Sequence, residues 1–239
     1  MDIDKKYYDD ICFILKTDPL NDSDMLINFY LQEHGRTNAI TRGIRKPDSK
    51  LSPLISVGNC VRGEFVTGRN GGLIMIGCTI ANGFNVRFHT YESLLTSIYL
   101  CNLVLRTIPM DSAEEGLFEL LYKTFSVLDD DNYVSLRIFF EYRFLALLGY
   151  GGDFTDEMQP YWQSLWNTNQ FTLKQQSVID EVCVFLEQGR LLDRMLSGLS
   201  RSLAIRALEK AWDDRIGGMV SSRRLLDEIY GDWFIQHHI

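Results

Sequence analysis

Paired cysteines, long apolar runs and familiar catalytic motifs are all missing from this sequence. The five cysteines, at positions 12, 60, 78, 101 and 183, are scattered and never spaced as CxxC. This pattern argues against a disulfide framework and against a zinc knuckle, so we predict that most are small buried hydrophobic residues. No stretch approaches the roughly 18–20 apolar residues of a membrane span. The first ten residues show no secretory signal, which leads us to expect a cytoplasmic protein.

No residue pattern indicates an enzyme. The sequence contains no GxSxG elbow, no phosphate-binding loop of the Walker type and no HExxH helix. The glycine-rich "GYGGDF" follows a predicted helix rather than a strand, so we interpret it as a helix end and turn. The acidic "LDDDN" at 128–132 lacks the spacing of a calcium-binding loop. A hydrolase stays open only if a cluster of His, Cys or acidic residues converges in a cleft.

Basic residues are in the minority, yet they gather in one segment. The chain has 24 Lys and Arg against 32 Asp and Glu, a formal charge of −8. Residues 36–69 contain seven basic and two acidic residues, which makes this segment +5 and the remainder −13. Because salt screens charges beyond about 8–10 Å, a local patch matters more than the total. The segment is either a solvated loop or a contact for nucleic acid.

The first 80 residues have the pattern of a small β-barrel. Five short apolar or alternating runs lie at 11–17, 25–31, 37–44, 59–68 and 72–80, and glycines separate them. Such spacing predicts a barrel or sandwich, and the length fits a five-stranded oligonucleotide-binding (OB) fold. The basic segment then lies between barrel strands. An Arg guanidinium can donate two parallel hydrogen bonds to phosphate oxygens. Gly35 and Gly43 allow the backbone to approach a ligand closely.

From residue 91 the apolar spacing becomes helical. We predict an all-helical region of five to seven helices over 81–239, with one helix capped at its start by Asp111 or Ser112. Another helix is expected to end at the glycines 149, 151 and 152. The stretch 153–171 shows no clear period and is predicted to be an irregular, aromatic-rich connection. Its side chains Tyr161, Trp162, Trp166 and Phe171 are expected to pack onto the helices.

Several weak motifs occur in an order that resembles the RecO family of bacterial recombination mediators. They are "NDSDMLINFYLQEHGR", "TRGIRKPDS", "KLSPLISVG", "LFELLYKTF", "FFEYRFLALLGYGGDF" and "RIGGMVSSRRLL". The resemblance covers nearly the whole chain. It implies an α+β protein with an OB-fold DNA-binding domain at 1–80 and a helical, partner-binding domain at 81–239.

The resemblance also implies a function without catalysis or cofactor. A RecO-like protein binds single- and double-stranded DNA, anneals complementary strands, and acts with RecR to help RecA replace single-strand-binding protein (SSB). By motif position the expected DNA-binding residues are Arg36, Arg42, Arg45, Lys46, Lys50, Arg62 and Arg223. Many family members carry a four-cysteine zinc site after the Leu-Gly-Tyr motif. Residues 153–171 contain no cysteine, so no metal is expected.

The family also docks the acidic C-terminal tail of SSB on its helical domain. Such a tail needs an apolar slot with a basic residue at its edge. Arg137 and Arg143 are the candidates, although an ordinary exposed Arg paired with Glu141 or Asp131 is the alternative. The strongly acidic total leaves a second function open. In that alternative the chain is an adaptor that recruits SSB or RecR and has little DNA binding of its own.

Overall fold

The computed structural model describes residues 7–81, 90–129, 131–150, 154–188 and 198–216. Contacts divide the chain into two compact units, Met1–Phe88 with Leu100–Val127 and His89–Tyr99 with Leu128–Ile239. The division falls inside helix α1 (Tyr91–Thr107), so the second half of α1 and helix α2 (Leu117–Val127) group with the N-terminal strands. The boundary expected at residue 80 stays a prediction.

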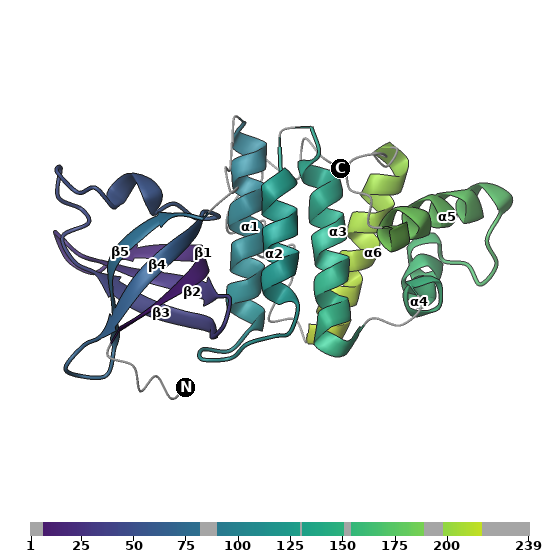
Figure 1. Cartoon of the computed structure of the whole chain (residues 1–239). Helices are drawn as coiled ribbons and strands as arrows, with labels where there is room; N and C mark the ends of the chain where they lie inside the picture. Colours follow the sequence, from purple (N-terminus) through teal and green to yellow (C-terminus); the bar gives the residue numbers. More distant parts are fainter. Residues whose placement is uncertain (1–6, 82–89, 130, 151–153, 189–197, 217–239) are drawn as a thin grey trace. The chain divides into compact units, whose positions relative to one another are not determined.

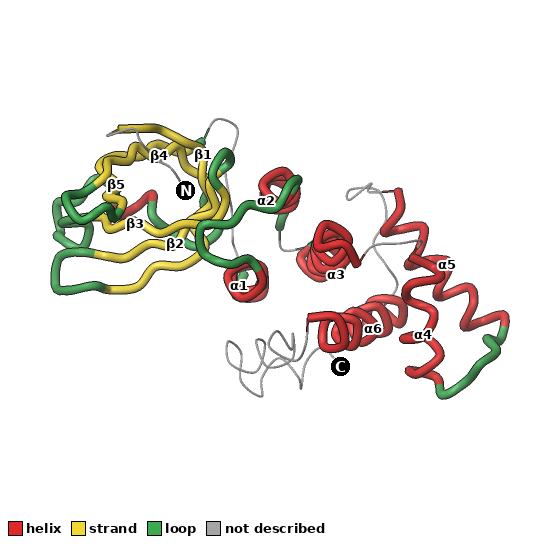
Figure 2. The backbone as a smooth tube through the Cα atoms, turned by 90° about the horizontal axis from the view of Figure 1, so that it is seen from below, coloured by secondary structure: helices red, strands yellow, loops and turns green. Residues whose placement is uncertain are grey.

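The first unit is built on a closed five-stranded barrel (Figures 1 and 2). Its strands are β1 (Tyr7–Pro19), β2 (Met25–Leu31), β3 (Gly35–Thr41), β4 (Cys60–Thr67) and β5 (Leu73–Ile80). They follow one another around the barrel as β1-β2-β3-β5-β4, with β3 and β5 parallel and every other pair antiparallel. This confirms the predicted OB-type barrel and places all five predicted strands.

The barrel interior is filled by alternate residues of each strand. Cys12, Ile14, Phe29 and Phe65 are fully buried there, as the two-residue period of a strand requires. The opposite face of β1 is buried as well, because Phe13 lies 5.5 Å from Phe118 and 5.6 Å from Phe125 of α2, measured between ring centroids. The aromatic contacts therefore fix α2 against the outside of the barrel.

The start of α2 differs from the sequence prediction. Asp111 and Ser112 do not cap it, because the helix begins at Leu117 after a loop in which Asp111 and Gly116 have positive φ. The loop instead pairs with β3. The Arg36 N–H donates to the Ser112 carbonyl at 2.8 Å, and the Asp111 N–H donates to the Arg36 carbonyl at 2.9 Å. Backbone pairing with a distant strand has replaced local capping.

The second unit is helical in its described residues. Besides the first half of α1 it contains α3 (Tyr133–Leu145), the π-helical turn η2 (Ala146–Tyr150), α4 (Phe154–Trp166), α5 (Leu173–Gln188) and α6 (Gly198–Ile216). Gly149 has φ 86° at the end of α3 and η2, as predicted for a terminating glycine. The expected glycines 151 and 152 lie outside the described residues. Phe144 of α3 packs against Trp212 of α6 at 5.6 Å between ring centroids.

The prediction of an irregular connection at 153–171 was wrong for most of its length. Residues Phe154–Trp166 form α4, with Pro160 inside the helix. Met158, Tyr161 and Trp162 are buried at the i, i+3, i+4 spacing of one helical face. Trp166 stacks on Trp162 at 6.0 Å and meets Phe171 edge-on at 5.8 Å. The expected packing of these aromatic side chains is confirmed for Tyr161 and Trp162.

Candidate nucleic-acid interface

The basic residues that follow β3 form an exposed loop. Arg42, Arg45, Lys46 and Lys50 are all exposed, while Ile44 between them is buried and packs into the barrel core. We name residues 42–50 the basic loop. Gly43 has φ 66°, a left-handed conformation that favours glycine. The buried isoleucine and the glycine turn hold the loop on the barrel, while its basic side chains are exposed.

A turn between β1 and β2 positions the basic loop. The Gly43 N–H donates to the Asp24 carboxylate at 2.8 Å, and the Arg45 N–H donates to the Ser23 carbonyl at 3.0 Å. The Arg45 guanidinium donates to the Asn21 carbonyl at 2.5 Å. The Asn21 side-chain amide and the Gly43 N–H, both donating to this carboxylate, lower the pKa of Asp24. The acidic turn therefore holds the basic loop in one conformation.

Arg36 has a different environment from the basic loop. Its guanidinium donates to the carbonyl of Leu105 at 2.6 Å and also to the carbonyl of Ile108, at the C-terminal end of α1. A cation at a helix C-terminus binds carbonyls that have no partner within the helix. Burial lowers the pKa of Arg36. Arg36 therefore joins the barrel to α1. Its expected contact with DNA stays a prediction, and these hydrogen bonds argue against it.

Arg62 is exposed on the outer face of β4. Its guanidinium forms an ion pair with Asp9 of β1 at 2.7 Å, and the two side chains are 53% and 51% exposed. An ion pair this exposed contributes little to stability, about 0–1 kcal/mol, so a phosphate group can compete for the guanidinium. The geometry is compatible with the predicted role of Arg62.

The two expected tail-binding arginines lie in unlike environments. Arg137 is buried, with 4% of its side chain exposed, and pairs with Glu141 at 2.7 Å and with Glu209 at 3.5 Å. Burial lowers its pKa, but Glu141, Tyr99 and Glu209 together outweigh this effect and the pKa is raised. Its guanidinium also lies over the Tyr99 ring, 4.8 Å from the centroid. Arg143 is exposed and lies over Phe139. Arg223 lies outside the described residues.

The cysteines behave as predicted, since all five are buried and unbridged. Burial raises the pKa of Cys60 to about 12 and that of Cys78 to about 11, so both are inert thiols at neutral pH.

In the part of the chain that the structure describes, no three His, Cys, Asp or Glu side chains gather to hold a metal ion. None of the described helices has the length and apolarity that crossing a membrane requires.

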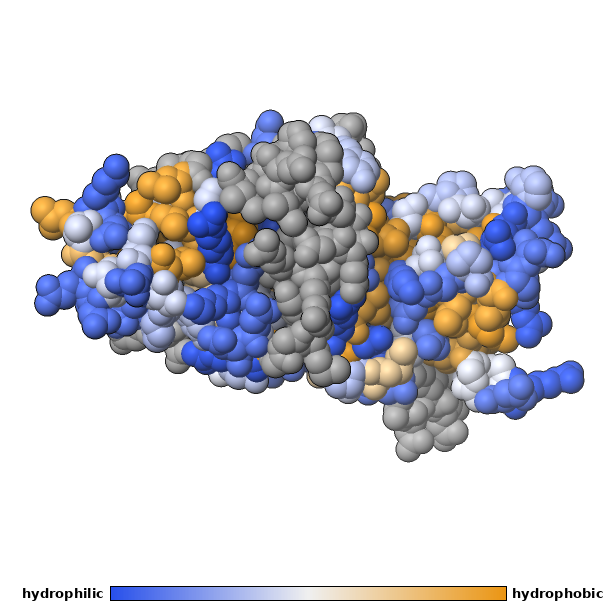
Figure 3. All heavy atoms as spheres, turned by 180° about the vertical axis from the view of Figure 1, so that it is seen from behind, coloured by the Kyte–Doolittle hydropathy of each residue, from blue (hydrophilic) through white to orange (hydrophobic). Residues whose placement is uncertain are grey.

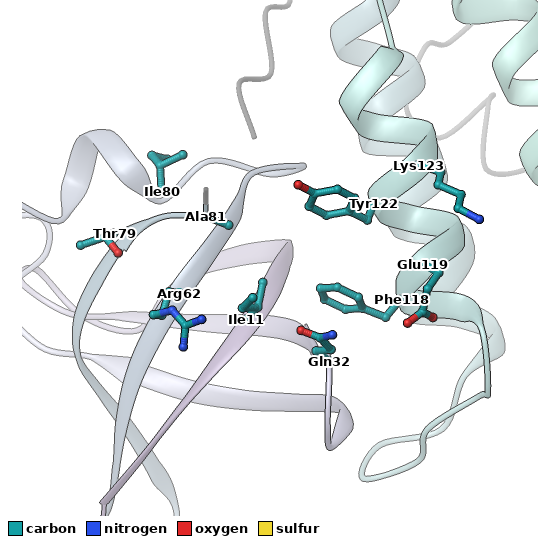
Figure 4. A pocket seen from close by; sticks show the side chains of 10 residues that line it. All are labelled: Ile11, Gln32, Arg62, Thr79, Ile80, Ala81, Phe118, Glu119, Tyr122 and Lys123. Atoms are coloured by element: carbon teal, nitrogen blue, oxygen red, sulfur yellow. The ribbon is translucent and has the colours of Figure 1, made fainter. Parts of the chain in front are cut away.

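Sequence reasoning missed a cavity between the barrel and α2. It has a volume of about 350 Å³ and is lined by side chains of β1, β4, β5 and α2 and by Gln32 after β2 (Figure 4). Phe118 and Tyr122 of α2 point into it from one side, and Ile11 and Arg62 face them from the barrel. The i, i+4 spacing of the two aromatic residues was visible in the sequence. The barrel residues that complete the lining, more than 35 positions away in the sequence, were not predictable.

Comparison with known proteins gives a consistent result. The family model described as "Recombination protein O N terminal" matches residues 6–77, and "Recombination protein O C terminal" matches residues 89–160. Together they cover more than half of the chain.

Curated relatives agree with the family models. "DNA repair protein RecO" of Syntrophus aciditrophicus is 31% identical over 141 residues, 58% of this chain and 54% of that protein. The protein of the same name from Clostridium novyi is 28% identical over 59% of this chain and 56% of its own length. The protein of the same name from Dehalococcoides mccartyi is 23% identical over 74% of this chain and 70% of its own length. The chain thus spans just over half the length of the first two relatives.

Proposed function

The chain belongs to the RecO family of DNA repair proteins, and on that premise we propose that it is a recombination mediator. In this proposal it binds single- and double-stranded DNA, anneals complementary strands and helps load RecA on SSB-coated DNA together with RecR. The observation that carries the proposal is the basic loop, an exposed group of four cations that a hydrogen-bonded turn fixes on an OB-type barrel.

The proposed mechanism is electrostatic. Arg42, Arg45, Lys46 and Lys50 contact phosphates, and each neutralised phosphate releases counterions into solution. A loop that binds backbone rather than bases leaves the Watson–Crick edges free to pair with a second strand. Two bound strands repel each other less, because the cations offset their charge. Annealing then follows from local concentration and charge neutralisation, without a covalent step.

Arg62 extends the proposed DNA contact beyond the loop, and Arg36 contributes indirectly. We assign Arg36 the task of joining α1 to the barrel, since both of its bonded carbonyls belong to the end of that helix. Arg223 stays a family-based candidate.

The proposed contact with the SSB tail depends on Arg143 rather than Arg137. The Arg137 guanidinium is bound by Glu141 and Glu209 inside the helical unit, so a carboxylate from a partner would have to displace two internal acids. Arg143 is exposed beside the buried Phe139 ring, so its guanidinium offers the accessible cation that such a tail requires. Recruitment of RecR is proposed from the family alone.

One observation favours the adaptor as a second candidate. The outer barrel surface exposes Tyr7 (52%) and Ile76 (49%), and the neighbouring Asp9 and Glu64 are paired in register across β1 and β4. Apolar side chains mixed with acids suit a protein partner better than DNA. Figure 3 shows orange hydrophobic groups among blue hydrophilic ones on the barrel side of the surface.

An annealing assay separates the two candidates. Complementary labelled oligonucleotides, bare or coated with SSB, are mixed with the wild-type chain or with the Arg42→Ala/Lys46→Ala variant. The mediator account predicts that wild type accelerates annealing of both substrates and that the variant accelerates it at least several-fold less. Equal acceleration by both proteins would contradict the loop assignment. No acceleration, combined with measurable binding to SSB, would favour the adaptor.

A further inference from the structure

The cavity between the barrel and α2 has an aromatic wall on one side. The Phe118 and Tyr122 rings lie 6.5 Å apart between centroids with an interplanar angle of 22°. Figure 4 shows both rings directed from α2 toward the barrel strands. Phe118 is only 7% exposed and packs against Phe13 of β1, which fixes the inner ring. Tyr122 is partly exposed, so its side chain remains reachable for a planar ligand.

The remaining lining combines apolar side chains with polar ones and with the acid Glu119. Ile11 and Ile80 supply apolar surface, and Ile80 is 40% exposed although it is large and hydrophobic. Gln32 and Thr79 supply an amide and a hydroxyl that can bond a polar ring edge. The volume of about 350 Å³ is within the range of small-ligand sites, roughly 300–1,000 Å³. This combination suits a flat aromatic group with hydrogen-bonding edges.

Arg62 supplies the cation beside this aromatic site. Its side chain lines the cavity and is held by Asp9 at 2.7 Å in an exposed ion pair, from which a phosphate can take over part of the bonding. Lys123 also lines the cavity, but Figure 4 shows its side chain extending away from the two rings, so we assign it no contact with the base. An aromatic face next to a guanidinium matches the two parts of a nucleotide, its base and its phosphate.

We propose that this cavity holds one unstacked nucleobase of bound single-stranded DNA, with the base against Tyr122 and the adjoining phosphate on Arg62. Stacking of bases on aromatic side chains is a common way in which proteins hold single strands without reading sequence. A duplex keeps its bases stacked and paired, so it contacts the basic loop but leaves the cavity empty. The cavity therefore gives the chain a preference for single strands. This inference rests on the proposed DNA binding and adds a base-binding site to it.

The test compares an ordinary oligonucleotide with one of equal length and charge in which the bases are replaced by abasic sites. Wild type should bind the abasic strand about tenfold more weakly, the order of loss expected for one stacked base. In Tyr122→Leu the ratio of the affinity for the ordinary strand to the affinity for the abasic strand should fall to about one to two, because the base has lost the ring on which it stacks. Duplex affinity should be the same in both proteins. An unchanged ratio in folded Tyr122→Leu would overturn the inference.

A second pair of variants avoids any dependence on the aromatic packing. Ile80→Glu places an acid at the cavity, and Ile76→Glu places the same charge on the same strand at a position that does not line it. Both side chains are exposed, so both variants should fold. Ile80→Glu should lose the preference for bases, and Ile76→Glu should keep it. Equal behaviour of the pair would contradict the site. If wild type binds no DNA at any salt concentration, the proposed function itself fails.

Discussion

Replacing Arg36 should lower stability more than it lowers DNA affinity. The guanidinium makes two hydrogen bonds to carbonyls at the end of α1, and a bond involving a charged group contributes about 1.5–3 kcal/mol. Because the side chain is only partly buried, water recovers part of this loss. Arg36→Met, which keeps the apolar stem, should therefore destabilise the chain by about 2–3 kcal/mol. For a chain of this size that corresponds to a melting temperature about 5–10 °C lower.

The matched control is Arg42→Met, which removes the same charge from the exposed basic loop. Calorimetry should show it melting close to wild type, and fluorescence anisotropy with a labelled single strand should show the larger loss of affinity. Arg36→Met should show the reverse, provided that binding is measured well below its melting temperature. A stable Arg36→Met variant with strongly weakened DNA binding would refute the assignment of Arg36 to the α1 end.

Three further outcomes follow from the contacts. Gly35→Ala should destabilise the chain by more than about 2 kcal/mol, because Gly35 has φ 73° and an added Cβ would lie 2.3 Å from a backbone oxygen. Gly72→Ala, whose added Cβ would meet nothing within 4 Å, should be near neutral in thermal melts. In urea denaturation, Arg137→Met should cost about 3–5 kcal/mol, since it leaves a buried carboxylate unpaired, and Arg143→Met less than about 0.5 kcal/mol. The lowered pKa of Asp24 means that its support of the basic loop is present at neutral pH and is lost as pH falls through the folded-state value; an NMR titration should show a midpoint below the ordinary range of Asp.

Local patterns were enough to predict the barrel. Glycine-separated runs of strand length predict where the five strands lie, although β1 extends over Tyr7–Pro19 and β3 over Gly35–Thr41 rather than over the predicted 11–17 and 37–44. The spacing alone left a sandwich open as well, and the available length and the family resemblance favoured the closed barrel. Gly43 is a case in which the sequence signal and the structure agree, as the loop needs its positive φ.

Long-range partners could not be predicted. Arg36 and Arg42 look equivalent in the sequence, and only the fold brings the end of α1, about 70 positions away, to Arg36. Arg137 gives no local sign of burial, because Glu209 reaches it from α6. Helix α4 was missed because residues 153–171 showed no clear period, although Met158, Tyr161 and Trp162 have the spacing of one helical face. The cavity beside α2 is lined by residues from five separate segments and forms only once the chain is folded.

The most direct test of the account is the salt dependence of single-strand binding for wild type and for Arg42→Ala/Lys46→Ala. Each lost phosphate contact reduces the slope of log affinity against log salt by about 0.7, so the variant should have a slope shallower by about 1.4. Lys174→Ala/Arg206→Ala, which removes two exposed charges from α5 and α6, is the control and should keep the wild-type slope. Equal slopes for all three proteins would contradict the claim that the basic loop binds the DNA.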